Sequence, residues 1–217
     1  MRTNPAVGEF YHVYNRGTDK RKIFLSQRDY QRFIILLYLA NSSQPVRIDL
    51  RRNSIEKLFE ADRGIELVDI GAYCLMPNHF HILLKEKVEN GTSLFMQKIT
   101  TAYTMYFNKK HERTGALLQG TYKAEHLTTD NYLKYIYSYI HLNPVKLIEP
   151  TWRENGIKNK QKVKSFLAAY QYSSYQDYLE SDRVEKIIIN KKAFPVYFER
   201  IGDFNKMIEF WLSFNEQ

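Results

Sequence analysis

Two histidines separated by one residue form the clearest metal-binding pattern in this sequence. His79 and His81 flank Phe80 within a run that is typical of a β-strand. Side chains two residues apart in a strand point to the same face, so both imidazoles should lie side by side while Phe80 points into the core. Two neutral imidazoles can chelate a divalent cation. The alternative is a chance pair of exposed histidines, which the pattern alone leaves open.

A tyrosine-rich segment, residues 130–142, carries a second group of reactive side chains and ends before Pro144. Helical spacing places Tyr139 and Asn143 one turn apart as surface neighbours, with Tyr135 on the same side. A phenol can attack phosphorus, and a carboxamide oxygen beside it can complete a metal site opened by two histidines. The alternative is structural, with the rings packed at a sheet edge and Asn143 capping the C-terminus of the helix.

The rest of the pattern predicts the elements that would position these groups. Runs rich in β-forming residues predict four strands, at residues 10–15, 65–76, 79–85 and 117–127. Helical spacing and capping residues predict three helices, at about 26–40, 93–111 and 129–143. The order β-α-β-β-α-β-α implies an α+β, ferredoxin-like (RRM-like) sandwich, in which an antiparallel sheet carries its helices on one face. The histidine pair would then lie on an exposed sheet face.

Length and charge indicate how the chain is organised and what it attracts. The 217 residues suit one domain, residues 1–150, with a small basic and helical C-terminal extension, residues 151–217. A net charge of +8 predicts attraction to polyanions, and 15% aromatic residues fit the stacking of bases in single-strand binders. The alternative is that the tyrosines fill a mixed core. The candidate DNA-binding residues are Lys109, Lys110, Arg113 and Lys123, although charged helix ends are usually just solvated.

The compartment is predicted from what the sequence contains. Cys74 is the single cysteine, so it has no partner for an intrachain disulfide, and a cytoplasmic location is expected. No apolar run approaches the roughly 20 residues that cross a bilayer, so no membrane partner is expected.

Several segments together resemble a known protein family. LMPNHFHILL at residues 75–84 resembles the HUH-motif strand of the single-tyrosine HUH transposases of insertion-sequence type. YIHLNPVK at residues 139–146 resembles their tyrosine helix, in the branch of REP-associated tyrosine transposases. YFNKKHERTG at 106–115 and QGTYK at 119–123 resemble the linking segment of that branch, with a weaker echo in YSSY at 172–175. The resemblance spans about residues 8–148.

The resemblance implies a role for each matching residue. His79 and His81 match the metal-binding histidines, Tyr139 the nucleophile, and Asn143 the polar residue that assists the metal. It further implies Mg²⁺ or Mn²⁺, a single-stranded DNA substrate with hairpin-forming repeats, and a 5′-phosphotyrosine intermediate. The oligomeric state is left open, with a homodimer as one option. Leu118 and Thr121 depart from the family pattern of tryptophan and arginine, which puts some DNA contacts in doubt but removes no catalytic group.

Three other functions compete with this one. A non-catalytic, ferredoxin-like protein could bind single-stranded nucleic acid by stacking bases on tyrosine. An HUH nickase of the replication-initiator or relaxase type would share the chemistry but act on another substrate. A metal-dependent hydrolase would use water as its nucleophile and leave Tyr139 a structural role.

Overall fold

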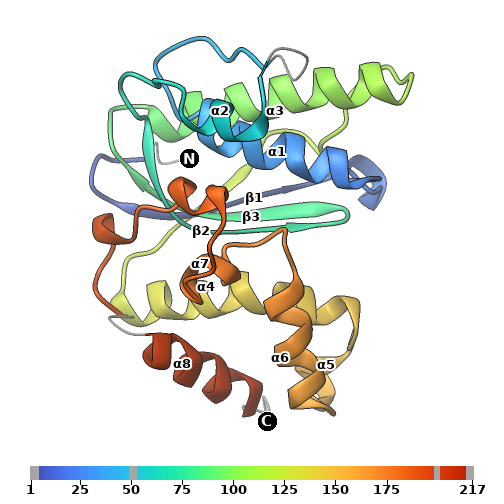
Figure 1. Ribbon diagram of the computed structural model, residues 1–217, viewed down its shortest axis with the longest axis vertical. Coiled ribbons are helices and arrows are strands. Elements are labelled where there is room, and N and C mark those ends of the chain that lie inside the picture. The colour runs from blue at the N-terminus through green and yellow to red at the C-terminus, as the bar shows by residue number, and fades with distance from the viewer. Residues whose placement is uncertain (1–4, 49–52, 198–200, 214–217) are drawn as a thin grey trace.

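A four-stranded antiparallel sheet lies at the centre of the computed structural model, which describes residues 5–48, 53–197 and 201–213 (Figure 1). The strand order is β2-β3-β1-β4, so β3 and β1 are central. Pro77 and Asn78 form the tight connection between β2 and β3. The α+β class with an antiparallel sheet is therefore confirmed. The strands are β1 (Phe10–Arg16), β2 (Val68–Met76), β3 (His79–Glu86) and β4 (Lys123–His126).

The fourth strand is shorter than the pattern predicted. Only Lys123–His126 pairs with β1 as a strand, whereas Leu118 forms an isolated bridge with Gly17. Gly120 separates the two with a φ of 64°, a left-handed conformation that interrupts an extended chain.

Two helices cover one face of the sheet, as expected. They are α1 (Gln27–Leu39) and α3 (Gly91–Lys110), and the short α2 (Ile55–Phe59) lies between α1 and β2 in the chain. Phe33 of α1 and Tyr103 of α3 pack with Phe80 in the core between helices and sheet. Asp29 accepts hydrogen bonds from the backbone amides of Leu25 and Ser26, each at 2.9 Å, and so fixes the start of α1.

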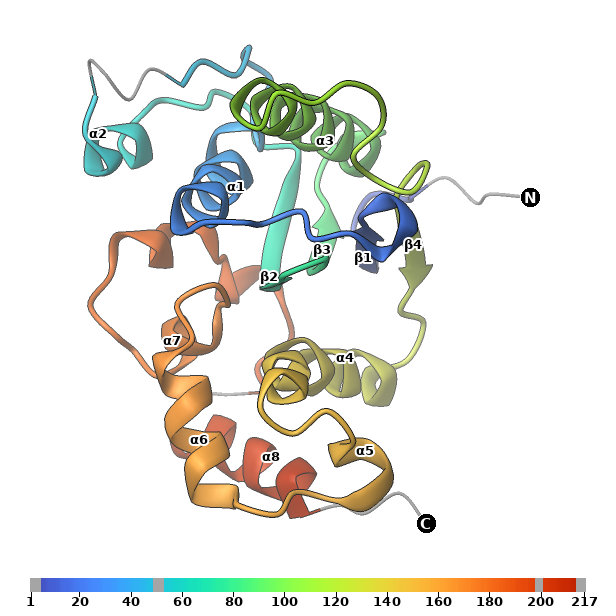
Figure 2. The same ribbon diagram turned by 90° about the vertical axis from the view of Figure 1, so that its right-hand side faces the viewer.

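The opposite face of the sheet is also covered, which corrects the expectation of helices on one face only (Figure 2). There α4 (Asp130–Leu142) packs on β2 and β3 and continues into the 3₁₀ turn η2 (Asn143–Leu147). The physical reason is the composition of that face, where Ala72, Cys74 and Leu83 are apolar and fully buried. A sheet that is apolar on both sides needs cover on both sides.

The C-terminal part continues this second layer and adds to its core. Val163, Leu167, Phe204 and Ile208 share one hydrophobic cluster with Ile136 of α4. Residues 1–150 and 151–217 thus have a core in common, and the division at residue 150 stays a prediction. The C-terminal elements are α5 (Trp152–Asn155), α6 (Lys160–Ala169), α7 (Tyr175–Tyr178), η3 (Val184–Ile188), η4 (Lys191–Ala193) and α8 (Ile201–Ser213). Among the described helices, none combines the length and apolar character needed to cross a membrane.

A short C-terminal stretch covers the free edge of β2. The amide of Leu75 donates to the carbonyl of Tyr172 at 2.9 Å, and the amide of Ser174 donates to the carbonyl of Tyr73 at 3.0 Å. These bonds satisfy backbone groups that an edge strand would otherwise expose.

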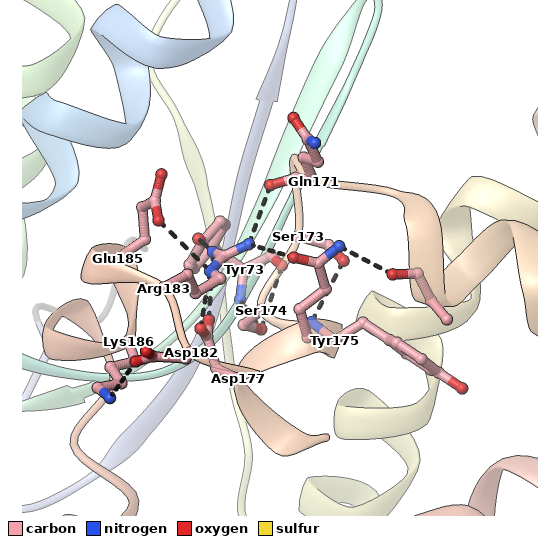
Figure 3. A network of polar contacts seen from close by, with 12 residues as sticks. Tyr73, Gln171, Ser173, Ser174, Tyr175, Asp177, Asp182, Arg183, Glu185 and Lys186 are labelled. Atoms are coloured by element: carbon pink, nitrogen blue, oxygen red, sulfur yellow. Dashed lines mark hydrogen bonds and ion pairs between the residues drawn. The ribbon is translucent and has the colours of Figure 1, made fainter. Parts of the chain in front are cut away.

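A buried ion pair holds this stretch in place (Figure 3). Arg183 Nε lies 2.9 Å from Asp177 Oδ1, and Arg183 also hydrogen-bonds the hydroxyl of Tyr73 in β2. The Asp177 side chain is only 1% exposed. Burial raises the pKa of Asp177 to about 6, and Arg183 opposes that rise. Removing one partner of such a buried pair typically costs about 3–5 kcal/mol, so this contact fastens the C-terminal segment to the sheet.

Candidate functional site

The first three residues of β3 place both histidines of the His-x-His pattern beside one cleft. His79 and His81 line a cavity of about 510 Å³, together with Tyr139 of α4. Their rings lie 5.0 Å apart, centroid to centroid, and nearly perpendicular. Phe80 is fully buried on the other face, as strand alternation predicted. Tyr14 of β1, Lys123 of β4 and Tyr139 of α4 line the same cleft, so the imidazoles do not lie on an open sheet face.

Tyr139 is the tyrosine that α4 turns toward the histidines. Its ring meets His81 edge-on at 5.2 Å between centroids and His12 at 5.7 Å. Tyr137 points the other way, into the core against Phe194. Helical periodicity therefore separates a core tyrosine from one that reaches the cleft.

Asn143 lies one turn after Tyr139, and its side chain is completely buried. Its Nδ2 donates to the Tyr139 carbonyl at 3.0 Å, which is a C-terminal capping contact. Its Oδ1 has no hydrogen-bond partner among the described residues. The carboxamide can therefore close the helix with one end and offer an acceptor with the other, so the structural and the functional interpretation are compatible.

The imidazoles in the site are held in the neutral form. Burial lowers the pKa of His79 to about 4, although the Asn143 carboxamide beside it acts in the opposite direction. Burial also lowers the pKa of His81 well below its usual value, and His12 and His79 add to the effect. A neutral imidazole keeps a lone pair, which is the form that binds metal ions.

The donor set fits a divalent cation as an open site. No three His, Cys, Asp or Glu side chains in the described part of the chain gather into a metal-binding group. His79 and His81 nevertheless supply two neutral imidazoles, and the unpartnered Asn143 Oδ1 supplies a buried oxygen. Three such donors would leave positions for water and phosphate oxygens, the usual companions of Mg²⁺ in phosphoryl-transfer sites.

The predicted cationic residues fall into two groups. Lys123 lines the cleft, and its Nζ lies 6.0 Å from the Tyr14 ring centroid. Lys109 and Lys110 end α3 and Arg113 follows it; none of the three lines the cleft. Lys110 Nζ is 2.7 Å from the buried Asp29 carboxylate, and Arg113 donates to Asn108 at 2.8 Å.

Sequence reasoning missed several residues that the fold brings to the site. Arg16 and Lys20 line the cleft, as does Thr121, one of the positions that depart from the family pattern. Arg153 of α5 places its guanidinium 4.7 Å from the Tyr139 ring centroid. His12 of β1 contacts His81 through ring nitrogens 2.9 Å apart. A usable signal was present for His12, because a histidine that lies between Tyr11 and Val13 in a predicted strand needs a hydrogen-bond partner if it is buried.

Comparisons with known proteins agree with this geometry. A family model described as "Transposase IS200 like" matches residues 36–143, about half of the chain. Among solved structures, the chain is similar to a REP-associated tyrosine transposase bound to a REP hairpin, with a TM-score of 0.51 and 13% sequence identity. That likeness covers 85% of this chain and 88% of the other and concerns the fold. No curated protein sequence matches the chain. From the family match and the shared fold, the chain belongs to the IS200-like transposase family, whose members act on DNA.

Proposed function

We propose that this protein cuts and rejoins single-stranded DNA by transesterification, with Tyr139 as the nucleophile and a 5′-phosphotyrosine as the intermediate. One observation carries the proposal: the Tyr139 ring stands edge-on to His81, 5.2 Å between centroids, in a cleft lined by cationic side chains. A nucleophile, two neutral imidazoles and groups that attract phosphate are the components that such a reaction needs.

The tyrosine performs the bond exchange. The Tyr139 oxygen forms a bond to the scissile phosphorus, the 3′ oxygen of the DNA leaves, and the 5′ end stays attached to the enzyme. The phenol releases its proton to water, and the departing 3′ oxygen takes one up. Because one phosphodiester replaces another, the energy of the bond is retained, and a second 3′-hydroxyl can reverse the step to join new ends.

The neighbouring side chains assist this exchange. His79, His81 and the Oδ1 of Asn143 would hold a divalent ion, Mg²⁺ or Mn²⁺. Such an ion, when bound, polarises the phosphate and offsets the charge that builds on it. Arg153, beside the Tyr139 ring, would stabilise the phenolate as it forms and again as it departs in the reverse step.

The proposed substrate is a single strand flanking a DNA hairpin. The REP-associated relative was solved with a REP hairpin, and we extend that class of substrate, and membership of that branch, to this chain. Lys123, Arg16 and Lys20 line the cleft where the flanking strand would lie. The cytoplasmic location, the homodimer option and DNA contacts by Lys109 and Arg113 stay predictions, whereas Lys110 is held by Asp29 and is not expected to add a contact.

A covalent adduct is the decisive test. Full-length protein is incubated with Mn²⁺ and labelled single-stranded DNA containing a hairpin from beside its own gene, then resolved on a denaturing gel. An SDS-resistant adduct is expected with wild type and with Tyr135→Phe, the matched control on the same side of α4, and none with Tyr139→Phe.

Each other outcome has a defined meaning. An adduct that persists in Tyr139→Phe would move the nucleophile to another tyrosine. Cleavage without any adduct would favour a metal-dependent hydrolase, and DNA binding without cleavage would favour a non-catalytic binder. An adduct with single-stranded DNA that lacks the hairpin, and none with the hairpin substrate, would favour an HUH nickase, which shares the chemistry but acts on another substrate.

A further inference from the structure

His12 lies in β1, the central strand next to β3, and its ring contacts that of His81. The two rings stack with centroids 5.0 Å apart and an interplanar angle of 21°. His12 Nε2 lies 2.9 Å from His81 Nδ1, and both side chains are buried. At that distance one of the two nitrogens carries a proton and the other accepts it. The position of this single proton decides which nitrogen of His81 keeps a lone pair.

Glu125 of β4 biases that choice. Its carboxylate accepts hydrogen bonds from Tyr14 at 2.7 Å and from Tyr132 at 3.0 Å, and its Oε2 lies 3.6 Å from His12 Nδ1. His12 Nδ1 is buried and has no hydrogen-bond partner among the described residues. A proton on His12 Nδ1 would face a negative charge, whereas a lone pair there would be repelled by it. The carboxylate therefore favours the His12 tautomer protonated at Nδ1.

That tautomer determines the state of His81. With its proton on Nδ1, His12 can only accept at Nε2, so His81 must donate from Nδ1. A neutral His81 then carries its lone pair on Nε2, the nitrogen that does not face His12. His81 lines the cleft, so this lone pair is the one available to a ligand there. Metal-binding histidines commonly donate their other ring nitrogen in this way.

We propose that His12 is a positioning residue that carries the bias of Glu125 to His81 and holds His81 in the tautomer able to bind a metal ion. This inference rests on the proposed metal-binding role of His81. It extends the site across three strands, β3, β1 and β4, and assigns a task to a buried histidine that the proposed bond exchange does not itself use.

Two substitutions at His12 separate positioning from packing. A glutamine reaches about as far as Nε2 of histidine, so His12→Gln can still present an oxygen to His81 Nδ1. An asparagine reaches only about as far as Nδ1, so His12→Asn keeps a polar group but leaves His81 without its acceptor. Glu125→Gln removes the charge and nearly preserves the shape, and Glu125 is 44% exposed, so this variant should fold.

The first readout is the protonation pattern of His81 in metal-free, full-length protein. Long-range ¹H–¹⁵N NMR distinguishes protonated from unprotonated ring nitrogens, and loss of signals in His81→Asn assigns them. We expect wild-type His81 to be protonated at Nδ1 and unprotonated at Nε2, with the opposite tautomer appearing in Glu125→Gln. A wild-type His81 protonated at Nε2, or a Glu125→Gln spectrum unchanged from wild type, would overturn the inference.

The second readout is Mn²⁺ affinity without DNA, measured with MnCl₂ by electron paramagnetic resonance. We expect about 10-fold or weaker binding in His12→Asn and near wild-type binding in His12→Gln, since outer partners of metal ligands typically contribute 10- to 100-fold. Equal affinity in both variants, with thermal melting showing both folded, would mean that His12 only packs the core and does not position His81. Absence of Mn²⁺ binding in the wild type would instead refute the metal site under the proposed function, and the NMR result would still decide the tautomer.

Discussion

Two lysines that look equivalent in the sequence should behave differently toward DNA. Lys123 lines the cleft, and no carboxylate pairs with it among the described residues. Lys110 is held by Asp29, a carboxylate with a fully buried side chain, at 2.7 Å. A free surface cation can replace counterions on a phosphate, whereas a cation already neutralised by a carboxylate has little left to contribute. Replacing each lysine with methionine, which keeps much of the apolar stem, tests this difference.

The two substitutions should change different quantities: Lys123→Met the salt dependence of DNA binding, and Lys110→Met the stability of the fold. Each phosphate contact on a single strand contributes about −0.7 to the slope of log K against log salt, so Lys123→Met should flatten the slope by about 0.7. Over a fourfold rise in salt, the loss of affinity should then be about 2.6-fold smaller than in wild type. Lys110→Met should leave the slope unchanged but lower stability by about 2 kcal/mol, because it strips a buried carboxylate of a charged partner. For a chain of this size that corresponds to a fall of roughly 4–8 °C in melting temperature.

Fluorescence anisotropy in the Tyr139→Phe background, in which no cleavage is expected, gives the slope, and calorimetry gives the melting temperature. The reasoning is refuted if Lys110→Met flattens the slope while Lys123→Met does not, because the contacts would then lie along the end of α3. Equal flattening in both variants would mean that DNA contacts both the cleft and the end of α3. It would also mean that the ion pair with Asp29 does not prevent Lys110 from binding phosphate.

Four further predictions rest on the same geometry. His79→Ala and His81→Ala should each abolish cleavage while the protein stays folded, and EDTA should do the same to wild type; full activity in EDTA would contradict the metal assignment. Cleavage assays over a range of metal concentrations should show Mn²⁺ acting at lower concentration than Mg²⁺, because Mg²⁺ gives up its water ligands reluctantly and demands near-ideal octahedral geometry. A hairpin with a single-stranded flank should be cut in the flank and its fully paired duplex left intact, which gel analysis of both substrates checks. Burial alone would raise the pKa of Asp29, but hydrogen bonds from Lys110, the Leu25 amide and Tyr106 lower it to about 2. The ionised carboxylate should therefore stabilise the fold by about 2 kcal/mol above about pH 4, and this contribution should disappear as the pH falls through 2. Acid unfolding of Asp29→Asn should therefore lack this component.

Local patterns predicted much of the site because its main parts are local. The strand period placed His79 and His81 on one face with Phe80 on the other, and the helical period placed Tyr139 beside Asn143. The contact of His12 with His81 joins residues 69 positions apart and depends on which strands are neighbours, a property that periodicity does not encode. For the same reason the sequence did not reveal Arg153, which comes from a four-residue helix beyond the matched family segment.

The position of the tyrosine helix depends on the C-terminal part of the chain as much as on the sheet. His141, two residues after Tyr139, is completely buried, and its Nε2 lies 2.8 Å from Ser174 Oγ. Ser174 in turn accepts the amide of Tyr73 in β2 at 2.9 Å, so one hydroxyl joins α4 to the sheet. Buried hydrogen bonds of this kind hold their partners at a fixed separation, because a buried polar group left without a partner destabilises the fold. The separation between Tyr139 and the histidines is therefore set from both sides of α4: by the apolar side chains that pack it on the sheet, and by a serine from the segment that sequence alone marks as an extension.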